Sequence, residues 1–131
     1  MSKNVRKKIF QIIFEINEKG AFSNIAITRN IEELDSNNAS FVREVVYGVI
    51  ENKIYIDWII KKFSKVKFKK ISPPIKNILR MGVYQLVFLD RIPDSAAVNE
   101  SVKLSKRYGH KGTHGFVNSI LRNISRNKED I

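Results

Sequence analysis

Apolar residues recur at intervals of three and four along most of the chain, which is the spacing that one buried face of an α-helix requires. In the first stretch this spacing runs from Val5 through Ile9 and Ile13 to Ile16. These stretches lack the strict alternation of apolar and polar positions that a half-buried strand would need. The pattern predicts an all-α fold of about seven helices joined by short loops, at residues 3–19, 23–33, 41–50, 54–63, 73–87, 96–108 and 116–126.

Residues that start, end or crowd helices fall at suitable places in these segments. Gly20 is suited to ending the first helix. Ser72 is suited to capping the fifth helix, because Pro73 follows it in the first turn, where a missing N–H group costs little. Gly48 lies inside the third helix and indicates close packing against a neighbour.

The length of the chain bounds its organisation. With 131 residues and 43% hydrophobic content, we expect one domain, residues 1–131, with a substantial core. No run of about 18 apolar residues could span a bilayer, and the N-terminus lacks the apolar stretch of a secretory signal. We therefore expect no membrane association and a cytoplasmic location.

Basic residues arrive in three blocks that contain no acid. The 24 Lys and Arg residues outnumber the 13 Asp and Glu residues, giving a formal net charge of +11, and the excess lies in residues 1–14, 61–80 and 101–128. One block alone could be a solvated surface, with Phe63, Val66 and Phe68 facing inward. Three blocks and this net charge favour a polyanion as partner. We predict one nucleic-acid-binding face formed by Lys3, Arg6, Lys7, Lys8, Lys65, Lys67, Lys69, Lys70, Lys106, Arg107, Lys111, Arg122 and Arg126.

The chain offers few groups for catalysis. It has no cysteine, which excludes disulfides, thiolate zinc sites and a cysteine nucleophile. His110 and His114 are four residues apart in GHKGTHG, but no carboxylate or cysteine accompanies them, so we expect histidines that face RNA or solvent and no metal site. GHKG also fits the GXXG loop of a KH domain, but that fold needs strands that the pattern does not predict. We expect no enzymatic activity from this chain.

Other candidate residues have structural explanations. Glu100 is placed to pair with Lys103 three residues later on the same helix. Asn118 lies between apolar neighbours and is expected to hydrogen-bond a loop backbone inside the bundle. Three aromatic residues could stack on bases, although core packing is the simpler expectation for each: Phe68, Tyr84 and Tyr108.

Three stretches occur in an order typical of one family, and the likeness extends over nearly the whole chain: FVREVVYGVIENKIYIDWII, ILRMGVYQLVFLDRIPDSAAVNESVKLSKRYG and GFVNSILRNISR. They resemble the NusB-type RNA-binding fold. The resemblance implies two packed helical subdomains and RNA contact by an N-terminal basic helix, here at Arg6, Lys7 and Lys8. Lysines replace most of the family's arginines there. Because lysine lacks the planar fork of arginine, we expect attraction to phosphates rather than sequence-specific reading.

The family has two branches. One is a free-standing transcription antitermination factor that binds boxA RNA with a small ribosomal protein. The other is the N-terminal domain of RsmB-type small-subunit rRNA cytosine-5 methyltransferases. YQLVFLDRIPDSAAVNE and NSILRNISR are more similar to the second branch, because the free-standing factor more typically has an acidic residue where Arg122 follows Leu121.

The second branch implies that residues 1–131 are the N-terminal part of a longer methyltransferase. Methylation of this type resembles reactions in which a cysteine thiolate attacks the base, and this chain has no cysteine. Methyl transfer and its cofactor S-adenosylmethionine would therefore belong to a tethered catalytic domain, and we expect no cofactor in this chain.

Overall fold

The computed structural model describes the backbone of residues 3–131 and the side chains from residue 5 onward. These residues confirm the all-α prediction, because they form seven α-helices and two 3₁₀ turns and contain no strand. The elements are α1 (Lys3–Lys19), α2 (Ser23–Ile31), α3 (Ser36–Glu51), α4 (Lys53–Phe63), η1 (Phe68–Lys70), α5 (Pro73–Phe88), α6 (Asp94–Tyr108), α7 (Thr113–Asn127) and η2 (Lys128–Asp130).

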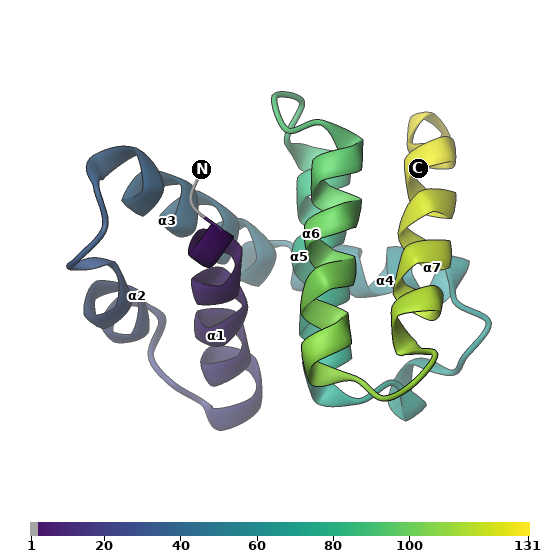
Figure 1. The fold of residues 1–131 in the computed structure, drawn as a ribbon, viewed down its shortest axis with the longest axis horizontal. Coiled ribbons are helices and arrows are strands. Elements are labelled where there is room, and N and C mark those ends of the chain that lie inside the picture. Colours follow the sequence, from purple (N-terminus) through teal and green to yellow (C-terminus); the bar gives the residue numbers. More distant parts are fainter. Residues whose placement is uncertain (1–2) are drawn as a thin grey trace.

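The helices form two packed groups. Helices α1, α2 and α3 contact one another in the N-terminal half, and α4, α5, α6 and α7 contact one another in the C-terminal half. Figure 1 shows the halves side by side, with α6 and α7 toward the viewer. Helix α5 joins them, because it also packs against α1 and α3. The two helical subdomains implied by the family resemblance are therefore present.

Helix α5 is the centre of the core. Its buried residues lie on every side of the helix, as expected for a helix that neighbours surround. Apolar residues such as Ile78, Leu79 and Met81 are fully buried. The helix also buries three polar side chains, Asn77, Arg80 and Gln85. Each of these must find a partner inside the protein, because an unpaired buried polar group is costly.

Arg80 supplies a polar contact between the two halves. Its guanidinium donates two hydrogen bonds to the carboxylate of Asp57 on α4, at 2.8 and 3.0 Å, and one to Asn77 at 2.9 Å. Glu18 on α1 lies 3.6 Å from the same guanidinium. Asn17 on α1 completes the network by donating to Asn77 at 2.9 Å. The network therefore ties α1 to α4 and α5.

Two glycines have the roles that the sequence predicted. Gly20 has a φ of 71°, a left-handed conformation that favours glycine, and it follows the last residue of α1. Gly48 faces the ring of Tyr84, which occupies the space that a Cβ at position 48 would need. Helices α3 and α5 therefore approach closely at this point.

The predicted cap at Ser72 is wrong in its mechanism. Its side chain makes no capping hydrogen bond, although its backbone carbonyl accepts a bond from the Lys76 amide at 2.9 Å and Pro73 does occupy the first turn. The start of α3 does have a side-chain cap, where the Asp35 carboxylate accepts from the Asn38 amide at 2.8 Å.

None of the described helices combines the length and apolar character needed to cross a membrane.

Candidate nucleic-acid interface

The segment from Ser64 to Lys70, called the lysine loop below, holds its lysines in solvent. Helix α4 ends at Phe63, and the Ser64 hydroxyl then forms a tight turn by accepting from the Val66 amide at 3.0 Å and donating to the Val66 carbonyl at 2.6 Å. The turn η1 follows, and the buried side chain of Ile71 anchors the end of the loop. This geometry leaves four lysines exposed: Lys65, Lys67, Lys69 and Lys70.

The charge of the lysine loop is not neutralised within the described residues. No carboxylate there lies within 4.0 Å of any of its four lysines. Three of them, with Lys61, line a hollow of about 500 Å³. The ring of Phe68 supports the loop from within, because the ammonium groups of Lys76 and Lys61 lie 4.7 and 5.1 Å from its centroid. The loop therefore presents concentrated positive charge to an anionic partner.

A groove of about 570 Å³ brings the lysine loop together with the connection between α6 and α7. Val66 lines both this groove and the neighbouring hollow, so the two depressions are adjacent. The second and third basic blocks of the sequence therefore meet at one end of the C-terminal half. We call this depression the basic groove; its lining includes Val66, Lys70, Ile71, Ile75, Tyr108, His110, Thr113 and Phe116.

Local backbone bonds shape the α6–α7 connection. Gly112 has a φ of 92°, a left-handed conformation that lets the chain turn into α7. The Thr113 hydroxyl accepts a hydrogen bond from the His110 amide at 3.1 Å, and His110 Nδ1 lies 3.1 Å from the Lys111 carbonyl oxygen. Lys111 is exposed within this loop. Helix α7 begins at Thr113, three residues earlier than the apolar pattern predicted, because the pattern starts only at the half-buried Phe116.

The histidines of this loop do not resemble a metal site. His110 and His114 are both exposed, and the described residues contain no group of three or more histidine, cysteine or carboxylate side chains that could hold a metal ion. His110 lines the basic groove, where it can face a bound ligand.

Arg6 does not lie on the predicted exposed face of α1. Its side chain is only 8% exposed, and its Nε donates to Gln85 Oε1 of α5 at 2.9 Å. The guanidinium also lies 5.6 Å from the ring centroid of Phe41. Burial lowers the pKa of Arg6, and the charge of Glu100 opposes that shift. The prediction that Arg6 contacts RNA beside Lys7 is therefore corrected: Arg6 joins the two halves of the fold.

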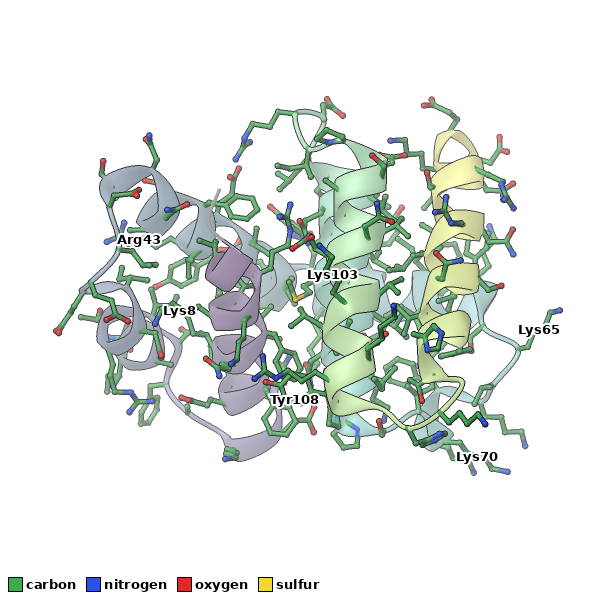
Figure 2. All side chains as sticks on the ribbon, in the orientation of Figure 1. Lys8, Arg43, Lys65, Lys70, Lys103 and Tyr108 are labelled. Carbon is green, nitrogen blue, oxygen red and sulfur yellow. The ribbon has the colours of Figure 1, made fainter. Side chains whose placement is uncertain are left out.

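The rest of the first basic block is separated from the basic groove. Lys8 pairs at 2.8 Å with Glu33, which lies in the turn after α2. Lys7 is half-buried and has no carboxylate partner among the described residues. The predicted contact Lys3 lies outside the described side chains. Figure 2 shows Lys8 on the N-terminal half, well apart from Lys65 and Lys70 at the end of the C-terminal half.

The third basic block is spread along two helices. Lys106 and Arg107 are exposed in the last turn of α6, beside the basic groove. Arg122 and Arg126 are exposed on α7, and Arg126 is thirteen residues beyond Thr113, or about 20 Å along the helix. The structure therefore brings Lys65, Lys67, Lys69, Lys70 and Lys111 to one end of the bundle, with Lys106 and Arg107 next to them. It does not bring Arg126 to that end.

The expectations for the remaining polar residues had mixed outcomes. Lys103 does pair with Glu100, at 3.2 Å. Asn118 does not bond a loop backbone, because its Oδ1 accepts from Arg122 Nε at 3.0 Å on the exposed side of α7. This bond orients the Arg122 side chain.

The three candidate stacking residues lie in different surroundings. Phe68 is half-buried in the lysine loop, with Lys61 and Lys76 over its ring. Tyr84 is buried against Gly48 and stacks on Phe88, with 5.0 Å between ring centroids. Tyr108 packs against Phe10 at 4.5 Å and also lines the basic groove. Phe116, the first residue of the last predicted helix, lines the same groove. The apolar lining was missed because each aromatic residue also fits a helical core pattern.

Comparison with known proteins identifies the fold. A model of the NusB family matches residues 3–126. The chain belongs to the NusB family. Its helices overlay a NusB structure from T. maritima with a TM-score of 0.86 and 25% identity, covering 98% of this chain and 96% of that one. The NusB fold also appears in a crystal structure of the antitermination factors NusB and NusE in complex with double-stranded RNA, with a TM-score of 0.84 and 23% identity over 95% of each chain.

Two kinds of curated NusB-family relative differ in length. The chain is 37% identical to a probable ribosomal RNA small subunit methyltransferase B of Bacillus subtilis, over 94% of this chain but only 28% of that protein. It is 33% identical to the transcription antitermination protein NusB of Bacillus licheniformis, over 97% of this chain and 98% of that protein. The chain thus spans less than a third of the methyltransferase relative and nearly all of the antitermination relative.

Proposed function

We propose that this NusB-family chain binds RNA at the basic groove and the lysine loop. The observation that carries the proposal is that uncompensated lysines lie at the rim of a groove with an apolar and aromatic lining. Lysines attract the phosphate backbone, and the half-buried rings of Tyr108 and Phe116, which line the groove, can contact bases. A duplex or a single strand would be held mainly through its phosphates, since the loop carries lysines and no arginine.

We further propose that the domain positions rRNA for a methyltransferase of which it is the N-terminal part. The similarity to the Bacillus subtilis methyltransferase B and the basic residue Arg122 after Leu121 support this assignment. Methyl transfer, with S-adenosylmethionine, is assigned to a tethered catalytic domain, because this chain has no cysteine to serve as the nucleophile. On this assignment the protein works in the cytoplasm.

A second candidate function is that of a free-standing antitermination factor. The similarity to the Bacillus licheniformis NusB over nearly the full length of both chains favours it. In this case the chain would bind boxA RNA together with a ribosomal protein. Both candidates require RNA binding and differ in the second partner.

The test of RNA binding is a filter-binding titration at several salt concentrations. Neutralising Z phosphates makes the logarithm of affinity fall with the logarithm of salt at a slope of roughly −0.7Z to −0.9Z. Changing Lys69 and Lys70 to Gln should weaken binding and reduce the magnitude of that slope by about 1.4 to 1.8. The control changes Lys19 and Arg43 to Gln. These two residues are exposed on the N-terminal half, so the substitutions remove the same amount of charge away from the proposed site. Equal effects of both pairs would reject the proposed site.

A second experiment separates the two candidates. Affinity for fragments of small-subunit rRNA is compared with affinity for boxA RNA, each with and without the ribosomal protein. Tighter binding to boxA only when the ribosomal protein is present would favour the antitermination factor. Tighter binding to an rRNA fragment, unaffected by that protein, would favour the methyltransferase domain.

A further inference from the structure

Helix α4 carries large apolar side chains on its solvent side. Ile54 is 89% exposed, Trp58 is 50% exposed and Tyr55 is 38% exposed, whereas Ile56, Ile59 and Ile60 of the same helix are fully buried. Phe88, at the end of α5, is also exposed. We call Ile54, Tyr55, Trp58 and Phe88 the aromatic strip. None of these four side chains lines the basic groove.

The rings of the aromatic strip are held in place from below. Tyr55 and Trp58 lie nearly parallel, with centroids 5.9 Å apart and 12° between the ring planes. The edge of Phe88 meets Tyr55 at 6.1 Å, and Phe88 in turn stacks on the buried Tyr84. A continuous series of rings therefore connects the exposed indole to the core. Such support fixes an aromatic surface before a ligand arrives, so little ordering is needed on binding.

Positive charge borders the strip on one side. The Lys62 ammonium lies 5.2 Å from the Trp58 ring centroid, one helical turn along α4. A separate hollow lies beside Ile54 and Trp58, and Lys53 also lines it. Among the described residues, no carboxylate lies within 4.0 Å of Lys53 or Lys62. Glu51 also lines that hollow; it is the last residue of α3 and so lies near the start of α4, whereas Lys62 is in the last turn of α4. The acidic Glu51 therefore lies near the start of α4, and the basic Lys62 lies near its end. The lysine loop follows α4 directly in the chain.

We infer that the aromatic strip is a second RNA contact, on which an unpaired base stacks against Trp58 while Lys62 contacts the adjoining phosphate. An aromatic face next to a free lysine suits single-stranded nucleic acid, because any base can stack on it. The position of Glu51 directs the strand from Trp58 toward Lys62 and the lysine loop. The inference rests on the proposed RNA-binding function, and it adds a preference for single-stranded segments and a site on α4.

Trp58 allows a direct test because it is the only tryptophan of the chain. Its fluorescence is recorded during titration with a 12-nucleotide oligouridine, and with a blunt 12-base-pair RNA duplex for comparison. Base stacking should quench the emission with the single strand and leave it nearly unchanged with the duplex. Trp58→Leu keeps an apolar side chain and should weaken oligouridine binding, measured by fluorescence anisotropy, by about 5- to 100-fold. Duplex affinity should stay within about twofold.

Matched variants control for folding and for general hydrophobicity. Phe22→Leu changes an exposed aromatic residue of the N-terminal half and should leave oligouridine affinity unchanged. Lys62→Gln should weaken oligouridine binding and lower the magnitude of its salt slope by about 0.7. Circular dichroism should show native helix content and an unchanged melting temperature for Trp58→Leu, since the side chain is half exposed.

The outcomes separate the two proposals. If oligouridine binds Trp58→Leu with the affinity of the unsubstituted protein, and native Trp58 emission does not change, the aromatic strip is not an RNA contact although RNA binding stands. If neither RNA binds at all, the proposed function fails together with the inference. If emission shifts with protein concentration in the absence of RNA, and sedimentation shows a dimer, the strip is a self-association surface and the inference is overturned.

Discussion

Changing Arg6 to Met should destabilise the fold and leave the RNA site intact. The substitution removes the donor to the fully buried Gln85 and the contact with the Phe41 ring. A hydrogen bond from a charged group contributes about 1.5 to 3 kcal/mol, and a cation–π contact about 0.5 to 1 kcal/mol. Relief of a buried charge offsets part of this loss, so we expect a net decrease of about 2 to 3 kcal/mol in unfolding free energy.

Urea unfolding and thermal melting measure this loss. For a domain of 131 residues, a loss of 1 kcal/mol in unfolding free energy lowers the melting temperature by about 4 °C. The melting temperature of Arg6→Met should therefore fall by about 8 to 12 °C. Adding Gln85→Leu should recover part of the loss, since no buried acceptor is then left unpaired. Lys7→Gln is the control, because the neighbouring Lys7 is half-buried and pairs with no carboxylate among the described residues; it should change stability by less than about 0.5 kcal/mol. The reasoning is refuted if Arg6→Met unfolds like the unsubstituted protein and its RNA affinity falls tenfold.

Three further substitutions test other contacts. Arg80→Met leaves the Asp57 carboxylate without its bidentate partner and should lower the free energy of unfolding, measured in urea, by about 3 to 5 kcal/mol. The double variant Arg80→Met with Asp57→Leu should be much closer to the original stability. A small effect of the single change would contradict the network. Gly48→Ala should lower the free energy of unfolding by about 1 to 3 kcal/mol, because the new Cβ overlaps the Tyr84 ring, although alanine favours helix. In the same assay, the loss should be smaller when Tyr84 is changed to Leu. Burial by itself raises the pKa of Asp94, but hydrogen bonds from Ser125 and Lys128 outweigh it and leave the pKa below the ordinary 3.8. A carboxyl group whose pKa is lower in the folded state stabilises the fold at pH values above its unfolded-state pKa. This stabilisation disappears as the pH falls through the folded-state pKa. The stability difference between native protein and Asp94→Asn should therefore be largest near neutral pH and vanish in acid; a difference independent of pH would contradict the ionic role.

Local periodicity was sufficient to predict the helices. Every helix has buried or half-buried apolar residues three or four positions apart, including α5, which is buried on all sides, so the segments and the all-α class could be predicted from the sequence. Boundaries were less accurate where the first turn is polar. Helix α6 begins at Asp94 and α7 at Thr113, both ahead of the first apolar residue of their pattern. Helix starts depend on backbone turns, such as that at Gly112, which apolar spacing does not record.

The site was harder to predict, because charge counts do not show where a charged side chain points. Arg6 was counted with an exposed basic block, yet it stands three residues before Ile9 and seven before Ile13, and these spacings put it on the buried side of α1. Helical register applied to the basic residues would have separated it from Lys7. Arg80 shows the same error, because it adds to the charge of residues 61–80 but pairs with Asp57 in the interior.

The meeting of the lysine loop with the α6–α7 connection follows from the packing of the C-terminal half. Helix α4 delivers the lysines to one end of that half, and α6 and α7 turn back at the same end, where Gly112 allows a short loop. No local sequence pattern relates Lys70 to His110, forty residues later. Cations that are not neutralised at this end repel one another, and an RNA backbone would relieve that repulsion. RNA should therefore raise the melting temperature of the protein, and raise it less when Lys69 and Lys70 are changed to Gln. An equal rise in both proteins would place the RNA elsewhere on the surface.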